Sequence, residues 1–344
     1  MMLEMAALKA LSARVGADPL LVQAAGGNTS LKEGGIMWIK ASGTWLQHAE
    51  ARDIFVPVAL DSLLKALLRD DPACETCTDF IRDDLNSLGL RPSIETTVHA
   101  SFAHRVVVHV HCIATISIAV REDAEMILAP LLKEFHWAFV PYRRPGLPLA
   151  REIRKRLKPD TNVLILGNHG LVVAGQTVAQ AETLLGRVVQ ALVRPVRPIL
   201  SRTEPRPPSV GHDEGYAASS DPGVRSLALD PASLALARKG TLYPDHIVFL
   251  GAGIAVAEPG VTPALAARRI GLTGRPEPKL IVMPGEGVLL PRDATPAIHA
   301  MARCLADVAL RLAIDDPVRV LAREDELALV NWDAEKYRQS LPTA

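Results

Sequence analysis

Apolar and polar positions follow two alternating patterns over the first 194 residues. Short apolar runs of strand length, rich in β-branched residues, occupy residues 36–40, 106–111, 115–120, 162–166 and 171–174. Between them, apolar residues recur at helical spacing over residues 3–15, 61–69, 76–87, 94–102, 123–133, 149–157 and 178–193. This alternation predicts an α/β fold in which helices cover a central sheet. The runs at 106–111 and 115–120 lie too close together for a crossover, which favours a hairpin and a sheet that is not wholly parallel.

The pattern changes between residues 195 and 222, where six prolines stand among Ser, Arg and Gly with little apolar periodicity. Such a stretch is typical of a linker or an exposed loop. A second α/β pattern follows, with strands predicted at 246–250, 279–283 and 288–290 and helices at 263–270 and 296–313. We therefore predict a larger α/β domain at residues 1–195, a Pro-rich linker at 196–223 and a smaller C-terminal α/β domain at 224–344. The chemical motifs described below all lie in the first domain, which we expect to be the catalytic one.

Composition and charge narrow the class of protein. The chain has 344 residues, 49% hydrophobic and 22% charged, as in a folded soluble protein of about two domains. Lys+Arg and Asp+Glu both number 38 and aromatic residues make up 4%, so we expect neither nucleic acid nor a membrane surface as partner. The N-terminal segment has the pattern of an amphipathic helix rather than a signal peptide. Four cysteines form no disulfide framework, so we expect a cytoplasmic protein with reduced thiols.

The strongest chemical signal is the sequence VVVHVH at residues 106–111. Side chains alternate faces along a strand, so His109 and His111 point the same way, about 7 Å apart along the strand, and both imidazoles can converge on one ion. His169 follows the apolar run at 163–166 in a glycine-flanked turn and is the best third ligand. An isolated H-x-H pair is often a packed or surface feature, but three histidines after matching strands favour a metal site.

Glu95 lies in RPSIETTVH, where Ser93 has the character of an N-cap and Glu95 falls in the first turn of a helix. Two interpretations remain open here. Glu95 either interacts with the helix dipole, or acts as a general acid/base where the helix meets the metal cleft. His99 is four residues further on the same helical face. It is either a partner that supports the site residues or a packed histidine, and we favour packing.

Two glycine-containing segments, AAGGNTSL at 24–31 and KASGT at 40–44, expose backbone N–H groups and short hydroxyls. These groups can hold a phosphate or a carboxylate. The same residues also make ordinary turns, and the Gly-Lys-Ser/Thr ending of a Walker A motif is absent.

The motifs GGNTS, ASG, PSIETTVHA, VVVHVHC and GNHGLVVAG, in this order, resemble the class II aldolase/adducin family. That family includes L-fuculose-phosphate and L-rhamnulose-phosphate aldolases and ribulose-phosphate 4-epimerase. The resemblance covers roughly residues 3–195 and implies a three-layer α/β/α domain with a mostly antiparallel central sheet. PSIET and the C-terminal LVNWDAEKYRQSL are most similar to the aldolase part of rhamnulose-1-phosphate aldolase/dehydrogenase-type proteins, which implies a chain without the dehydrogenase part.

The resemblance also implies residue roles. His109, His111 and His169 would bind Zn²⁺ or another divalent metal ion, and Glu95 would be the catalytic acid/base. The substrate phosphate would be held by Asn28, Ser42, Gly43 and Ser93. Ile94 departs from the smaller sugar-phosphate aldolases, which have a serine there, so one phosphate donor is lost.

We therefore expect a zinc-dependent aldolase that cleaves a ketose phosphate by a retro-aldol reaction. An epimerase or a decarboxylase of the same family, and an adducin-like non-catalytic interaction module, are the alternatives; the presence of all four site residues argues against the module. The resemblance further implies a homo-oligomer, a tetramer, with the site near a subunit boundary. A tyrosine borrowed from a neighbouring subunit would be the second proton donor, with Tyr216, Tyr243 and Tyr337 as candidates.

Overall fold

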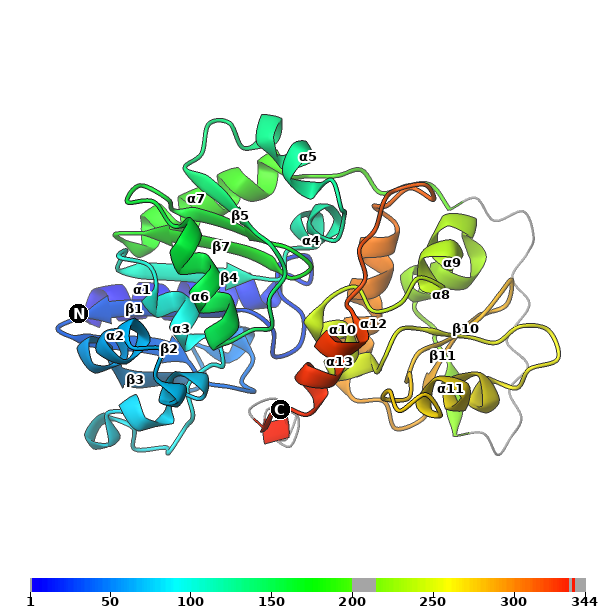
Figure 1. The fold of residues 1–344 in the computed structure, drawn as a ribbon, viewed down its shortest axis with the longest axis horizontal. Coiled ribbons are helices and arrows are strands. Elements are labelled where there is room, and N and C mark those ends of the chain that lie inside the picture. The colour runs from blue at the N-terminus through cyan, green and yellow to red at the C-terminus, as the bar shows by residue number, and fades with distance from the viewer. Residues whose placement is uncertain (1, 200–214, 334–335, 338–344) are drawn as a thin grey trace.

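A computed structural model describes residues 2–199, 215–333 and 336–337, which form two lobes, each built on its own sheet (Figure 1). We call residues 2–191 the N-terminal lobe and residues 215–333 the C-terminal lobe. The N-terminal lobe has a seven-stranded sheet in the order β3-β2-β1-β4-β7-β6-β5. Its strands are β1 (Asn28–Glu33), β2 (Ile36–Lys40), β3 (Phe55–Ala59), β4 (Val106–Val110), β5 (Trp137–Val140), β6 (Val163–Leu166) and β7 (Gly170–Gly175).

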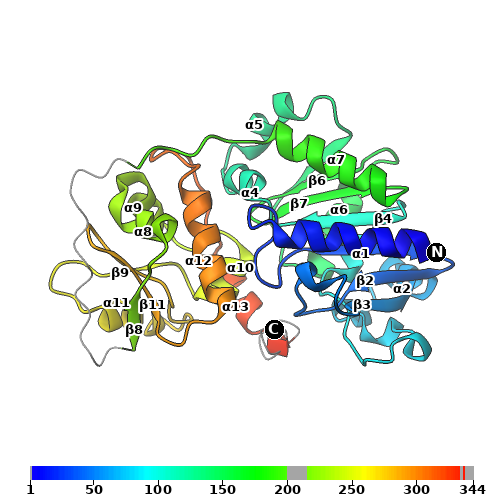
Figure 2. The ribbon, with the colours of Figure 1, turned by 180° about the vertical axis from the view of Figure 1, so that it is seen from behind.

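Helices cover both faces of this sheet. Helices α1 and α7 lie on one face, as Figure 2 shows, and α2, α3 and α6 lie on the other. The sheet is antiparallel throughout except for the β5–β6 pair. The predicted three-layer, mostly antiparallel α/β architecture is therefore confirmed. The helices of the lobe are α1 (Met2–Ala17), α2 (Leu60–Leu68), α3 (Thr96–Ala100), α4 (Ile113–Ala119), α5 (Ala124–Leu131), α6 (Leu147–Arg156) and α7 (Val178–Ala191).

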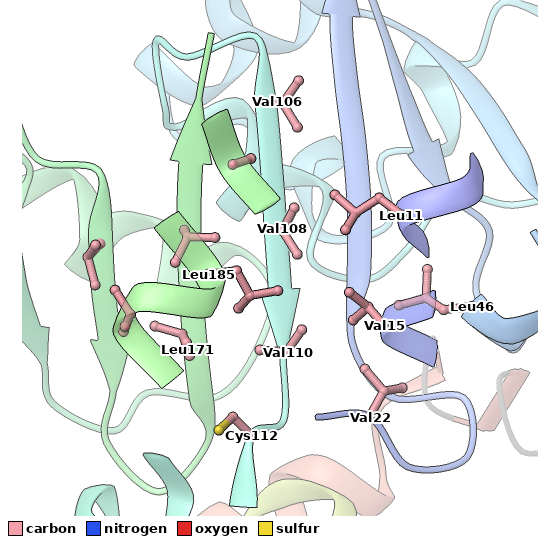
Figure 3. Close-up of a cluster of buried hydrophobic side chains, with 14 of the residues drawn as sticks. Leu11, Val15, Val22, Leu46, Val106, Val108, Val110, Cys112, Leu171 and Leu185 are labelled. Carbon is pink, nitrogen blue, oxygen red and sulfur yellow. The ribbon is translucent and has the colours of Figure 1, made fainter. Parts of the chain in front are cut away.

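Strand β4 forms the centre of the sheet because its valines are buried on both faces. Val106, Val108 and Val110 enter the core beneath α1 and α7 (Figure 3). Val107 points to the opposite face and packs in the core beneath α3 and α6. His109 shares that face by the two-residue period of a strand. The alternation predicted from the sequence is thus observed, and it directs the H-x-H pair away from the main core.

The predicted strand at 115–120 is wrong, because this segment forms helix α4. Ile113 and Ile116 pack in the core of the C-terminal lobe, whereas Ile118 and Ala119 pack in the core of the N-terminal lobe. This short helix therefore places apolar side chains in both cores. Burial between two lobes therefore outweighs the β propensity of this segment, and β4 pairs with β1 and β7 instead.

Other differences concern shorter elements. The predicted helix at 76–87 is replaced by 3₁₀ turns at Pro72–Glu75, Thr78–Phe80 and Asp83–Leu85, because Cys77 adopts a left-handed backbone conformation that interrupts a helix. Helix α3 is shorter than the predicted 94–102. Strands β1, β3 and β5 were not predicted from the sequence.

The C-terminal lobe has a four-stranded sheet in the order β8-β11-β10-β9. It contains strands β8 (Tyr216–Ala218), β9 (Ala255–Val256), β10 (Ile281–Met283) and β11 (Gly287–Pro291). Its helices are α8 (Pro222–Leu229), α9 (Pro231–Ala237), α10 (Pro244–Leu250), α11 (Pro263–Gly271), α12 (Pro296–Ala309) and α13 (Arg323–Val330). Residues 200–214 of the predicted linker lie outside the described residues, and β8 begins within the predicted linker. The domain division itself stays a prediction.

The predicted strand at 246–250 is also wrong. Pro244 begins α10, where its fixed φ favours a helix, and Gly251 ends it with φ +83°. These two end signals outweigh the β-branched residues between them. In the described part of the chain, no helix combines the length and apolar character that crossing a bilayer requires.

Candidate metal centre

Four buried side chains converge at the carboxyl end of β4: Glu95, His109, His111 and His169. The Nε2 atoms of His109 and His111 are 3.2 Å apart. The two carboxylate oxygens of Glu95 lie 3.3 Å from His109 Nε2 and 3.5 Å from His169 Nε2. One ligand atom from each residue can be chosen so that all lie within 4.8 Å of one another.

Local structure explains how each side chain reaches this point. His109 is in β4, and His111 directly follows the strand on the same face. His169 lies in the turn between β6 and β7, where Asn168 adopts φ +54°, a conformation that asparagine tolerates better than most residues. Gly27 allows the β1 loop to approach β4 closely, since a Cβ there would lie 2.8 Å from the carbonyl oxygen of His109.

The cluster suits a divalent transition-metal ion. A tetrahedral site with metal–ligand bonds of about 2.0–2.1 Å places its ligand atoms about 3.3 Å apart, close to the three separations of 3.2, 3.3 and 3.5 Å. The Nδ1 atom of His109 faces outward at 3.0 Å from the carbonyl oxygen of Leu171, which leaves Nε2 directed inward. This donor set, three imidazoles and one carboxylate, is one that zinc binds.

Burial and neighbouring charges set the protonation states of His109, His169 and Glu95. Burial lowers the pKa of His109 and lowers that of His169 to about 3, so both imidazoles are neutral near pH 7, with a lone pair available to a metal ion. Burial raises the pKa of Glu95, but the three neighbouring histidines and the Asn28 amide outweigh it and bring the pKa to about 2. Glu95 is therefore a carboxylate near pH 7.

A hydrogen-bond network holds Glu95 in place. Asn28 Nδ2 donates to Glu95 Oε2 at 2.9 Å and to Ser93 Oγ at 3.1 Å. Asn28 Oδ1 pairs with His99 Nε2, and His99 Nδ1 lies 2.7 Å from Ser30 Oγ. The prediction that His99 is merely packed was wrong, because its ring orients the amide that holds Glu95.

The predicted cap at Ser93 differs in detail. Glu95 occupies the N-cap position of α3, and Ser93 Oγ accepts the backbone N–H of Glu95 at 3.2 Å. The Glu95 side chain forms no capping hydrogen bond. The absence of this bond leaves both interpretations of Glu95, the interaction with the helix dipole and the general acid/base, as predictions.

The cluster opens into a pocket. Its walls include Glu95, His111, His169 and the predicted phosphate-binding residues, namely Asn28, Ser42, Gly43 and Ser93. Ser42 Oγ is buried without a hydrogen-bond partner among the described residues. The structure thus brings the predicted site residues together around one pocket, with His109 buried behind it.

None of the three candidate tyrosines is among the described residues that line this pocket. Tyr243 is buried and donates to Cys304 Sγ at 3.3 Å. The guanidinium of Arg91 lies over the ring of Tyr337, with Cζ 4.2 Å from the ring centroid. Within one chain, no tyrosine in the described part is therefore placed to serve the pocket as a proton donor.

Sequence reasoning missed two charged residues of the pocket, Lys40 and Asp245. Lys40 stands at the start of the KASGT segment, and its Nζ donates to the carbonyl oxygen of Ala25 at 2.9 Å. Its position two residues before Ser42 could have identified it as a pocket residue from the sequence. Asp245 comes from α10 of the other lobe. No local pattern in the sequence indicates its proximity to His111.

The fold and the cluster define an α/β protein with a candidate Glu/His₃ metal centre at one end of an antiparallel sheet. Residues 7–192 match the Class II Aldolase and Adducin N-terminal domain. The chain belongs to the class II aldolase/adducin family, as the sequence motifs predict.

One curated relative is an uncharacterized oxidoreductase, YuxG, of Bacillus subtilis (strain 168). It is 32% identical over 176 residues, which are 47% of this chain and 25% of that protein. The chain therefore spans about a quarter of the length of this relative.

Two solved structures are similar to part of this chain. The N-terminal class II aldolase domain of a conserved protein from Thermoplasma acidophilum is 26% identical, with 54% of this chain and 90% of that chain covered and a TM-score of 0.47. L-fuculose-1-phosphate aldolase from Thermus thermophilus is 18% identical, with 56% and 92% covered and a TM-score of 0.37.

Proposed function

We propose that the protein is a metal-dependent class II aldolase that cleaves a ketose phosphate by a retro-aldol reaction. One observation carries this proposal: a buried carboxylate, Glu95, adjoins three imidazoles at the end of a pocket lined by small polar groups. Family membership supports a lyase-type enzyme.

His109, His111 and His169 would hold the ion, zinc or a similar divalent metal. When bound, such an ion supplies Lewis-acid stabilisation of the negative charge that develops on substrate oxygens. The outward hydrogen bond of His109 Nδ1 keeps its ring orientation fixed. The protein thereby presents a preformed set of donors that need not reorganise during the reaction.

Glu95 would transfer the proton at the carbon where the bond breaks. Its Oε2 is held by Asn28, whereas Oε1 has no hydrogen-bond partner among the described residues. A carboxylate fixed through one oxygen retains the other for a proton. Because its pKa is held low, Glu95 is a carboxylate when metal and substrate are absent. In the cleavage direction it would therefore first take up a proton, such as the one that the substrate hydroxyl releases as the aldehyde forms, and then deliver it to the carbon left by the broken bond.

The substrate phosphate would lie against Ser42, Gly43 and Ser93. The buried and unpartnered Ser42 Oγ supports this placement, since a phosphate oxygen supplies an acceptor for its hydroxyl. Lys40 supplies positive charge on the same wall. Asn28 already donates both of its amide hydrogens, so its part in phosphate binding requires that it release Ser93 or Glu95.

A panel of ketose 1-phosphates and tetronate phosphates tests the function. With zinc or cobalt supplied, we expect release of dihydroxyacetone phosphate from at least one ketose 1-phosphate, and no release by His111→Ala. Carbon dioxide from a tetronate phosphate would indicate a decarboxylase, and isomerisation without cleavage an epimerase. A protein that binds no divalent ion would indicate the adducin-like module.

The homotetramer also stays a prediction. Light scattering on the purified protein measures the mass of the assembly, and a single chain of 37.0 kDa in solution would contradict it.

A further inference from the structure

We propose that Asp245, in the C-terminal lobe, is a positioning residue of the metal centre: it orients the His111 imidazole and makes the second lobe part of that centre. The inference rests on the proposed metal site. Asp245 lies outside residues 7–192, the part of the chain that matches the family domain.

The contact is direct and buried. Asp245 Oδ2 lies 2.9 Å from His111 Nδ1, and the two side chains are 4% and 7% exposed. Electrostatic interactions are strong where water is excluded, so this pair constrains the ring more than a surface pair would.

The geometry assigns different tasks to the two nitrogens of His111. Its Nε2 faces His109 Nε2 at 3.2 Å, inside the cluster, whereas Nδ1 faces the carboxylate. A carboxylate beside Nδ1 favours the tautomer that carries its hydrogen on Nδ1, and this tautomer leaves the Nε2 lone pair directed at the ion. His109 follows the same pattern with the Leu171 carbonyl as acceptor. One ligand is therefore oriented by backbone of its own lobe, and the other by a side chain of the second lobe.

Gly26 leaves room for this pair. A Cβ at Gly26 would lie 2.7 Å from His111 Nδ1 and 3.0 Å from Asp245 Oδ2, closer than atoms tolerate. The first glycine of the GGNTS segment thus has a packing reason that is independent of phosphate: it opens the space through which the carboxylate reaches the histidine.

The segment that carries Asp245 is anchored beside the centre. Asn168 Nδ2 donates to the carbonyl oxygens of Leu242 and Arg319, both at 2.9 Å. Asn168 adjoins the ligand His169, so one turn both supplies a ligand and holds the opposite lobe. The ring of His246 also holds this segment: Nδ1 accepts the backbone N–H of Leu242 at 3.2 Å, and Nε2 lies 2.9 Å from the carbonyl oxygen of Gly253.

A purely structural role for Asp245 makes a different prediction. Asp245 lies in the first turn of α10, where a carboxylate stabilises a helix through its dipole. If this were its only role, replacing Asp245 would lower the stability of the metal-free protein and leave its affinity for metal unchanged. Metal affinity and stability therefore have to be measured separately.

The experiment uses the full chain, stripped of metal, as wild type, Asp245→Asn, Asp245→Ala and His111→Ala. Asp315→Asn makes the same chemical change at an exposed site of the same lobe and is the matched control. Cobalt(II) titration followed by visible absorption reports the ligand field, and chelator competition gives the zinc affinity. Thermal unfolding of each metal-free variant reports folding.

We expect Asp245→Asn and Asp245→Ala to bind zinc about 10–100-fold more weakly than wild type, the usual effect of losing such a partner. Asparagine can donate to Nδ1, which favours the tautomer whose Nε2 carries hydrogen and cannot bind the ion. The cobalt spectrum should change in both variants and stay as in wild type in Asp315→Asn.

Wild-type affinity and an unchanged cobalt spectrum in folded Asp245→Asn would overturn the inference and leave the proposed function intact. Reduced stability of that variant with unchanged affinity would overturn it equally, in favour of the helix-dipole role. A wild-type protein that binds neither metal would instead refute the proposed function, and this inference with it. Asparagine is nearly isosteric with aspartate, so the test stands even if Asp245→Ala does not fold.

Discussion

The substitution Glu95→Gln tests whether Glu95 acts in catalysis or only supports the structure of the metal centre. Glutamine keeps the length of the side chain and one oxygen, so Asn28 Nδ2, now 2.9 Å from Glu95 Oε2, can still donate to it. The three histidines remain in place. What disappears is the negative charge and the group that takes up the proton, so the expected loss falls on turnover.

General acid/base catalysis is typically worth about 10²–10⁴-fold in rate. At about 1.4 kcal/mol per decade, that is roughly 3–5 kcal/mol of activation free energy. The cost to folding should be smaller, about 1–2 kcal/mol, because a hydrogen bond to a carboxylate becomes one to a neutral amide. Metal should remain bound, since the imidazoles supply three ligands.

The assay is the initial rate of ketose-phosphate cleavage at saturating metal, with bound metal measured on the same sample. Glu125→Gln, at an exposed position of α5, is the matched control and should behave as wild type. A Glu95→Gln protein that retains metal and turns over at the wild-type rate would refute the catalytic role of Glu95. The remaining role for Glu95 would then be its interaction with the dipole of α3.

Three further predictions follow from the same structure. His111→Ala should lose stoichiometric metal and nearly all turnover, because two imidazoles make a poor site; His136→Ala, whose ring is largely exposed, should retain both in metal analysis. Ser42→Ala should raise KM about tenfold or more with metal content unchanged, since it removes one hydrogen bond to a charged group; equal turnover of unphosphorylated sugars would contradict the phosphate site. Burial lowers the pKa of His246 from 6.5 to about 4, so below pH 6.5 the unfolded chain takes up a proton that the folded protein does not, and stability falls. Urea denaturation in the presence of a chelator measures the free energy of unfolding at pH 7 and at pH 5. The decrease between these two pH values should be about 2 kcal/mol smaller in His246→Gln than in wild type. Equal decreases would contradict this assignment.

Much of the centre could be predicted from local sequence. The two-residue period of a strand places His109 and His111 on one face, and the valines before and between them explain why the strand is central. The turn around His169 follows a strand that pairs in the same sheet. These features depend on backbone geometry over a few residues, and local sequence determines that geometry.

Only the tertiary structure decided the rest. Residues 113–119 are helical because both lobes bury them, a condition that local β propensity does not register. The Asn28–His99 network and the contact of Asp245 with His111 join residues 71 and 134 positions apart. Such contacts depend on how the chain folds back on itself and on how the second lobe docks. Residue order and composition therefore specified which chemical groups are present and the face of the strand they occupy, whereas packing between distant segments specified which groups hold them in position.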